Sequence, residues 1–238
     1  MAEQHEPDSG GTGRRRRAYH HGDLRNALLE AAVRQVRENG PDAVVLREVA
    51  RATGVSSTAA YRHFANHQDL IEAVKQTASD LMAASVRAEL AAAPPSADPA
   101  EEALRRVRAA GSGYVSFARA EPGLFRIMFR GGEKPCEDPV IKHLRGVSDE
   151  GIDGGVKKDA SYTILAEALD DLVVHGVLSP ARRPFADVAL WSAVHGICTL
   201  LLESDLAALP EEAKQAAVER TFDVLLRGID DREPPPAG

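Results

Sequence analysis

Aromatic residues and cysteine are scarce in this sequence. Phe, Trp and Tyr make up 5% of the 238 residues, and cysteine occurs at positions 136 and 198. Two cysteines cannot build the disulfide framework of a small secreted domain, and the N-terminal residues lack the apolar stretch of a secretory signal. We therefore expect Cys136 and Cys198 to be free thiols in a cytoplasmic protein whose stability comes from its hydrophobic core, with a disulfide between them as the alternative.

Motifs typical of enzymes are also missing from the sequence. It contains no nucleophile elbow, no glycine-rich loop that would cradle a phosphate and no cluster of metal ligands at a useful spacing. His63 and His67 are four residues apart but straddle the end of an expected helix, and the adjacent His20 and His21 cannot share a helix face. The sequence therefore predicts no catalytic residue, no metal site and no cofactor.

The alternation of apolar and polar residues that is typical of strands is absent, whereas apolar residues recur at three- and four-residue spacing. We therefore expect an all-α fold. Turn-forming glycines and prolines separate the periodic segments. Helices are predicted over residues 23–39, 46–53, 57–64, 67–90, 100–120, 122–130, 159–178, 185–206 and 211–229. A loop with one helical turn near Ile141 is expected over residues 131–157.

Charge is distributed unevenly along the chain, and the net charge of −7 argues against nucleic-acid binding by the whole surface. Residues 14–65 hold ten arginines and five acidic residues, whereas the remainder is acidic. This asymmetry predicts that only the N-terminal part meets DNA. Within the basic run Arg14–Arg17, Arg16 and Arg17 are expected to contact DNA from a disordered arm over residues 1–17. A solvated tail without a defined contact remains the alternative.

Two short helices around Gly54 have the pattern of a helix-turn-helix. Small and apolar residues such as Val49, Ala50 and Ala60 would let these helices cross closely. The second helix then presents an outward face suited to base edges and phosphates: Ser57, Thr58, Ala59, Tyr61, Arg62 and His63. An ordinary pair of antiparallel helices with a polar exterior fits the same pattern.

Residues 18–74 closely resemble the DNA-binding domain of the tetracycline-repressor (TetR) family, because the element YRHF is followed at a specific spacing by the pair Asp69–Leu70. The resemblance implies an α-helical homodimer with a DNA-binding domain over residues 18–66, a ligand-binding and dimerisation domain over 67–230 and a disordered tail over 231–238. It also implies roles for individual side chains. Bases would be read by Ser57, Thr58, Ala59 and Arg62, phosphates by Tyr61 and His63, and a base or phosphate by Arg47.

Two positions depart from the pattern of the family. Val45 and Leu46 offer no hydroxyl at the start of the second helix, where the family often has Ser or Thr. His67 stands where a phosphate-binding Lys is usual, and imidazole is mostly neutral at pH 7. We therefore expect weaker anchoring on the phosphates at neutral pH and tighter binding as pH falls. His67→Lys should raise affinity by a similar factor for all sequences.

Ring-bearing side chains gather in two stretches, residues 113–129 and 190–202. The second stretch contains a Trp-x-x-x-His-Gly element, which resembles the C-terminal regulatory domain of one TetR subgroup over about residues 100–205. A pocket for a mostly apolar effector with one or two polar groups is therefore a hypothesis. Its lining would be Tyr114, Phe117, Phe125, Met128, Phe129, His175, Trp191 and His195. The same pattern is typical of an ordinary core, and both histidines could be satisfied core or interface residues.

The predicted helix over residues 185–206 is apolar on most of its circumference but too short and interrupted for a membrane span. The last helix offers a second apolar stripe: Val218, Phe222, Leu225 and Leu226. Two such helices from each subunit would close a four-helix homodimer interface. The resemblance to the TetR family implies this interface, and it also implies a dimeric repressor that binds a palindromic operator in double-stranded DNA and is released by a small-molecule effector. An activator, a DNA-binding dimer without an effector, and a monomer with one deep core remain alternatives.

Overall fold

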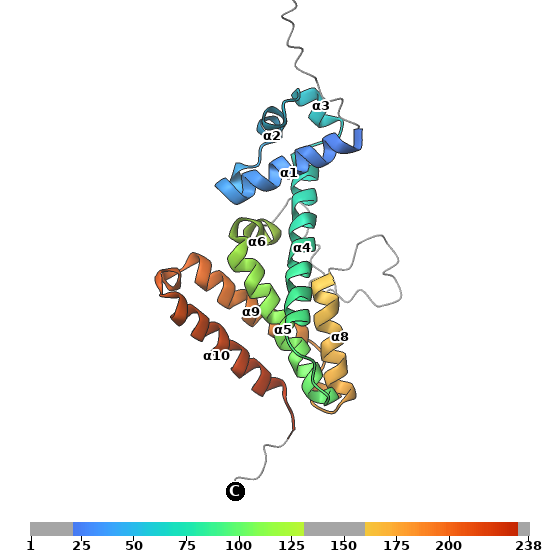
Figure 1. The fold of residues 1–238 in the computed structure, drawn as a ribbon, viewed down its shortest axis with the longest axis vertical. Helices are drawn as coiled ribbons and strands as arrows, with labels where there is room; N and C mark the ends of the chain where they lie inside the picture. Colours follow the sequence, from blue (N-terminus) through green and yellow to red (C-terminus); the bar gives the residue numbers. More distant parts are fainter. Residues whose placement is uncertain (1–20, 131–159, 233–238) are drawn as a thin grey trace, which may run out of the picture.

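The computed structural model describes residues 21–130 and 160–232, which form helices and no strand (Figure 1). The described helices are α1 (His21–Asn39), α2 (Leu46–Thr53), α3 (Ser57–Tyr61), α4 (His67–Ala92), α5 (Pro99–Ala120), α6 (Pro122–Phe129), α8 (Ala160–Val174), α9 (Ala186–Glu203) and α10 (Glu211–Ile229). Short 3₁₀ turns occur at Pro41–Ala43, Pro180–Arg182 and Asp205–Ala208. The prediction of an all-α protein is confirmed. The basic arm with Arg16 and Arg17, the turn near Ile141 and Cys136 lie outside the described residues.

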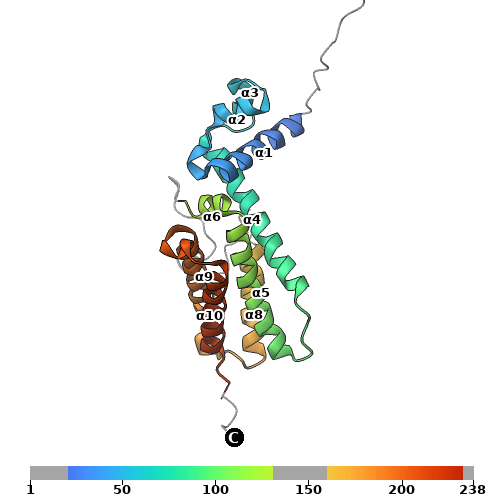
Figure 2. The same ribbon diagram turned by 60° about the vertical axis from the view of Figure 1, so that its left-hand side comes forward.

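Helices α1 to α3 form a head at the N-terminal end of the long helix α4, and α5 to α10 form the body (Figures 1 and 2). One apolar core runs without interruption from the head into the adjoining part of the body, from Leu28 and Phe64 through Leu70 to Val194. A second core fills the far end of the body, where α5, α8, α9 and α10 meet around Leu172. Because the core is shared, the head is packed firmly against the body.

Three predicted helix ends lie too far along the chain. Helix α3 ends at Tyr61 instead of residue 64, because the chain turns there to bury Phe64, which is 1% exposed. Helix α8 ends at Val174 instead of residue 178, because Gly176 adopts a left-handed φ of 69° and the amide of Val177 bonds back to the Leu172 carbonyl. Helix α9 ends at Glu203 because the chain passes into a 3₁₀ turn.

Residues 231 and 232, which were predicted to belong to the tail, make hydrogen bonds and ion pairs with the body. The amide of Asp231 donates to the Val177 carbonyl at 2.7 Å, and its carboxylate accepts from the amide of Ser179 and from Arg182. Arg232 reaches the Glu101 carboxylate at 3.0 Å. Residues 231 and 232 are therefore attached to the body.

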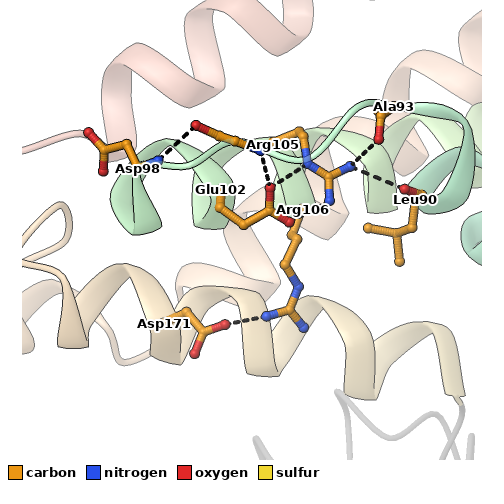
Figure 3. Close-up of polar contacts among 8 residues, drawn as sticks. Leu90, Ala93, Asp98, Glu102, Arg105, Arg106 and Asp171 are labelled. Carbon is orange, nitrogen blue, oxygen red and sulfur yellow. Dashed lines mark hydrogen bonds and ion pairs between the residues drawn. The ribbon is translucent and has the colours of Figure 1, made fainter.

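The connection between α4 and α5 is held by Arg105 (Figure 3). Its guanidinium donates to the carbonyls of Leu90 and Ala93, where α4 ends, and to the carboxylate of Glu102 on its own helix. Its neighbour Arg106 points the other way and pairs with Asp171 on α8. Two consecutive arginines thus tie α5 to the end of α4 and to α8.

Helix α9 is long and apolar enough to cross a membrane by length and composition alone, so the expectation that it is too short and interrupted for this is wrong. In this fold it packs against α5 and α10, and it buries Leu190, Val194, Cys198 and Leu201. Its apolar character is therefore explained in part by its place in the body. Ala189, Ser192 and Leu200 remain on an exposed face.

Candidate nucleic-acid interface and ring cluster

The head carries an exposed polar face built on a buried apolar one. Ala60 and Phe64 are 0% and 1% exposed, α3 packs against α2, and Arg25 of α1 lies over the Phe64 ring. Gly54, in the left-handed region with a φ of 76°, makes the turn between α2 and α3. The hydroxyl of Ser56 accepts from the amide of Ala59 and caps α3. These contacts set the direction in which α3 presents its remaining side chains.

The predicted recognition residues lie on the exposed part of this helix. Ser57, Thr58 and Arg62 are exposed, Tyr61 is 53% exposed, and Ala59 and His63 are half-buried. The structure therefore brings short polar groups, a cation and a phenol onto one surface, which is the arrangement that groove-reading helices use. Their contacts with DNA stay a prediction.

Helix α2 adds two arginines beside this face. The side chains of Arg47 and Arg51 are 77% and 82% exposed, and both lie within salt-bridge distance of Glu48. Surface pairs of this kind are weak, so either guanidinium can exchange its carboxylate for a phosphate. Arg51 did not appear among the predicted contacts. Its spacing of four residues from Arg47, which places both on one helix face, was the available signal.

The start of α2 has the predicted lack of a hydroxyl cap. Val45 occupies the N-cap position and makes no side-chain hydrogen bond. The ring of His67, whose contact with phosphate stays a prediction, lies with its Nε2 atom 2.8 Å from the carbonyl oxygen of Val44, and the residue as a whole is exposed. A carbonyl only accepts, so Nε2 carries the proton and faces into the head.

In the body, five of the eight predicted pocket residues form one ring cluster, which we define as Tyr114, Phe125, Phe129, Trp191 and His195. The His195 ring is its centre: its centroid lies 4.5 Å from that of Phe129 and 5.3 Å from those of Phe125 and Trp191. The hydroxyl of Tyr114 lies 2.8 Å from His195 Nδ1. Helices α5, α6 and α9 therefore meet where the Tyr114–His195 hydrogen bond is surrounded by aromatic rings.

The other three predicted pocket residues lie elsewhere. Phe117 is 3% exposed in the core, and Met128 is half-buried against it, but neither belongs to the ring cluster. His175 is exposed just beyond the end of α8 and has no ring contact with another described residue. Because Gly176 turns the chain at that point, the pocket predicted to include both His175 and His195 is wrong for His175.

The ring cluster is partly buried, and its role as a small-molecule site stays a prediction. Tyr114 and Phe125 are buried, whereas Phe129, Trp191 and His195 are half-buried. The Tyr114–His195 hydrogen bond is the polar contact among these apolar ring surfaces.

Helix α6 connects this cluster to the head. Its Phe125 and Phe129 belong to the ring cluster, while Gly123 packs so closely on Val36 of α1 that an added Cβ would overlap the Val36 carbonyl. Directly before α6, the Glu121 carboxylate accepts two bonds from Arg37, at 2.8 and 2.6 Å. The sequence could not have predicted this pair, since 84 residues separate its members.

The thiol of Cys198 is buried on α9. Burial raises the pKa of the Cys198 thiol from 9.0 to about 12, and this thiol is free. Such a group is inert as a nucleophile. Within residues 21–130 and 160–232, no group of three His, Cys, Asp or Glu side chains is placed to hold a metal ion.

Comparison with protein families gives two matches. The model of bacterial regulatory proteins of the tetR family matches residues 28–74, which cover most of the head and the start of α4. The model of a tetracyclin repressor-like C-terminal domain matches residues 107–225, which is half of the chain. No curated protein matches the sequence at a significant level.

Solved structures share the fold over nearly the whole chain. A protein of unknown function from Rhodococcus sp. RHA1 is 25% identical, with a TM-score of 0.68, over 90% of this chain and 100% of the other. A TetR family transcription regulator from Marinobacter aquaeolei VT8 is 18% identical (TM-score 0.58; 87% and 96%). The TetR family regulator PfmR from Thermus thermophilus is 20% identical (TM-score 0.52; 85% and 98%).

Proposed function

Because the chain belongs to the TetR family of bacterial transcriptional regulators, we propose that it is a cytoplasmic repressor that binds a palindromic operator as a homodimer and leaves it when a small effector binds. The DNA-binding fold and the regulatory role follow from the family. The operator, the dimer, the effector and the sign of regulation are the proposed parts.

The observation that carries DNA binding is the exposed face of α3. Ser57, Thr58 and Arg62 are exposed there, while Ala60 and Phe64 anchor the helix from behind. This division fits a recognition helix in the major groove, with the arginines of α2 close enough for phosphates. Selecting genomic DNA fragments with the purified protein should enrich a palindrome with half-sites about one helical turn apart or a multiple of it. The proposal fails if no palindrome is enriched.

Dimerisation is supported by the outer faces of α9 and α10, which lie side by side (Figures 1 and 2). At spacings of three and four residues these faces expose small and apolar side chains together with the cation of Arg220: Ala189, Ser192, Leu200, Ala213, Ala216, Arg220 and Val224. Two copies related by a twofold axis could bury this surface as a four-helix interface. Light scattering after size exclusion should give twice the 25.5 kDa mass of the chain. A single-chain mass would favour the monomer.

The ring cluster is the proposed effector site. Screening compounds by thermal shift should find stabilisers among mostly apolar molecules with one or two polar groups, because a ligand that binds only the folded state raises its stability. If only ions or highly charged metabolites stabilise the protein, this assignment is wrong. A DNA-binding dimer without an effector is the second candidate, and it is favoured by the burial of Tyr114 and Phe125.

The proposed release mechanism uses the two helices that join cluster and head. Helix α4 begins in the head and runs the length of the body, and α6 touches both α1 and the ring cluster. An effector that separates the rings would shift these helices and change the distance between the two recognition helices of the dimer. It can do so only if it binds the released state more tightly than the DNA-bound state.

A further inference from the structure

The ring of His67 joins the two ends of the helix-turn-helix. Its Nε2 atom lies 2.8 Å from the carbonyl oxygen of Val44, and it must be the donor because a carbonyl only accepts. Val44 directly precedes Val45, the N-cap of α2, and His67 is the first residue of α4. The bond therefore closes a loop of chain that contains α2, the turn and α3.

On the α2 side, the bond supplies what the local sequence lacks. Val45 provides no side-chain cap, and the first backbone bonds of α2 run from Glu48 and Val49 to the Val45 carbonyl. The Val44 carbonyl thus lies outside the bonding of the helix itself, and the imidazole satisfies it. With its own side chain 2% exposed, Val44 is also anchored in the core. The bond adds a polar restraint to the first turn of a helix that has no side-chain cap.

On the α4 side, the start of the helix is fixed without His67. The Asn66 side chain accepts from the amide of Asp69 at 2.9 Å and caps the helix. Phe64 and Leu70 on either side of the cap are 1% and 0% exposed. The first turn of α4 is therefore a rigid support, and the His67 ring extends that support to the start of α2.

We propose that His67 is a positioning residue for DNA reading: through Val44 it holds the start of α2, and with it Arg47, at a fixed place relative to α4. This rests on the proposed DNA-binding function. It differs from the phosphate contact expected at this position, because the Nε2 proton of this exposed residue is donated to the Val44 carbonyl within the head. What the head requires of the side chain is a correctly placed N–H donor, and a positive charge is not required.

Four variants separate positioning from phosphate contact. Gln places an amide N–H at about the reach of imidazole Nε2, whereas Asn places one at the reach of Nδ1. We expect His67→Gln to keep operator affinity, and His67→Asn and His67→Ala to lose roughly 3- to 10-fold, the range for one hydrogen bond. The slope of log affinity against log salt should be the same for the wild type and these three neutral variants.

The opposite pattern would overturn the proposal. A phosphate contact predicts that Gln fails to rescue, that every neutral variant lowers the salt slope by about one, and that His67→Lys binds more tightly with a steeper slope. Equal affinity of the wild type, Asn and Ala variants would overturn it too. Arg47→Ala calibrates the assay, because loss of a phosphate-facing charge should lower the slope by about one.

A measurement on the free protein keeps this test independent of the operator. Amide hydrogen exchange in the first turns of α2 should be faster in His67→Asn and His67→Ala than in the wild type, and unchanged in His67→Gln. If the wild type bound no DNA, the proposed function would fail, while this exchange pattern would still report the bond. Equal exchange in all the variants would remove the positioning role.

Discussion

Phe185 is the one described residue other than glycine with a positive φ. Its backbone lies at φ 62° and ψ 10°, its side chain is 57% exposed, and it makes no capping bond to α9. The left-handed region is unfavourable for an L side chain, and Asn tolerates it better than Phe. Phe185→Asn should therefore stabilise the protein by about 1 kcal/mol, seen as a higher urea midpoint. Phe185→Ala, which keeps the strain, should not, and a loss of stability in both variants would show that the ring is buried against a partner.

Glu102 makes the free energy of unfolding depend on pH at acidic values. Its pKa lies at about 2 instead of 4.5, first because its carboxylate accepts from Arg105 and second because it accepts from the amide of Ser96. Since the folded pKa is below the unfolded one, this contribution is present above about pH 4.5 and is lost as pH falls toward 2. Glu102→Gln should be less stable than the wild type at neutral pH and should lose less stability between these values. Parallel pH profiles from urea unfolding would contradict this.

The sequence predicts contacts between side chains only where the two residues are spaced to lie on the same face of one helix. Phe125 and Phe129, like Trp191 and His195, are four residues apart, so each pair lies on one helix face and enters the ring cluster together. For His175, the decisive fact is the end of α8 one residue earlier, which depends on the left-handed turn at Gly176. Spacing carries no information past the end of a helix.

Among the helices, α6 is held between the head and the ring cluster. Gly123 lies against the Val36 carbonyl, a backbone atom that cannot turn aside as a side chain would. Gly123→Ala should push α6 from α1 and destabilise the protein by about 1–3 kcal/mol, with faster amide exchange in α1. Gly228→Ala on α10 is the matched control, since an added Cβ meets nothing within 4 Å there. Equal exchange in α1 of both variants would show that α6 does not brace the head.

Helix positions could be predicted far better than helix contacts. The predicted bounds of α2 and α10 agree with the structure, because Gly54 and Pro210 mark breaks in an apolar period. The docking of α6 on α1 could not be predicted, because it depends on a missing Cβ at Gly123 and an ion pair between residues 84 apart. Neither the close approach at Gly123 nor the ion pair can be recognised until the relative positions of α1 and α6 are known.

For the molecule as a whole, Gly196 tests the proposed dimer. It lies on α9 between Ser192 and Leu200, and an added Cβ would meet nothing within 4 Å in the single chain. Gly196→Arg should therefore fold but separate the subunits, halving the mass seen by light scattering, because a long charged side chain buried without a partner at the centre of the interface is strongly unfavourable. Ala88→Arg on the exposed face of α4 should leave the mass unchanged. An intact dimer in Gly196→Arg would move the interface elsewhere.

The burial of Cys198 gives the protein a built-in reporter. Its thiol, on α9 one turn from His195, is 2% exposed, and with a pKa of about 12 it is almost wholly un-ionised at neutral pH. Alkylation of Cys198 therefore requires a transient opening of the body. In a Cys136→Ser variant, the rate of labelling measures how often α9 detaches. An effector that binds the closed ring cluster should slow labelling, and one that parts the rings should accelerate it. The sign of that change can be read without operator DNA and before the effector's mechanism is known.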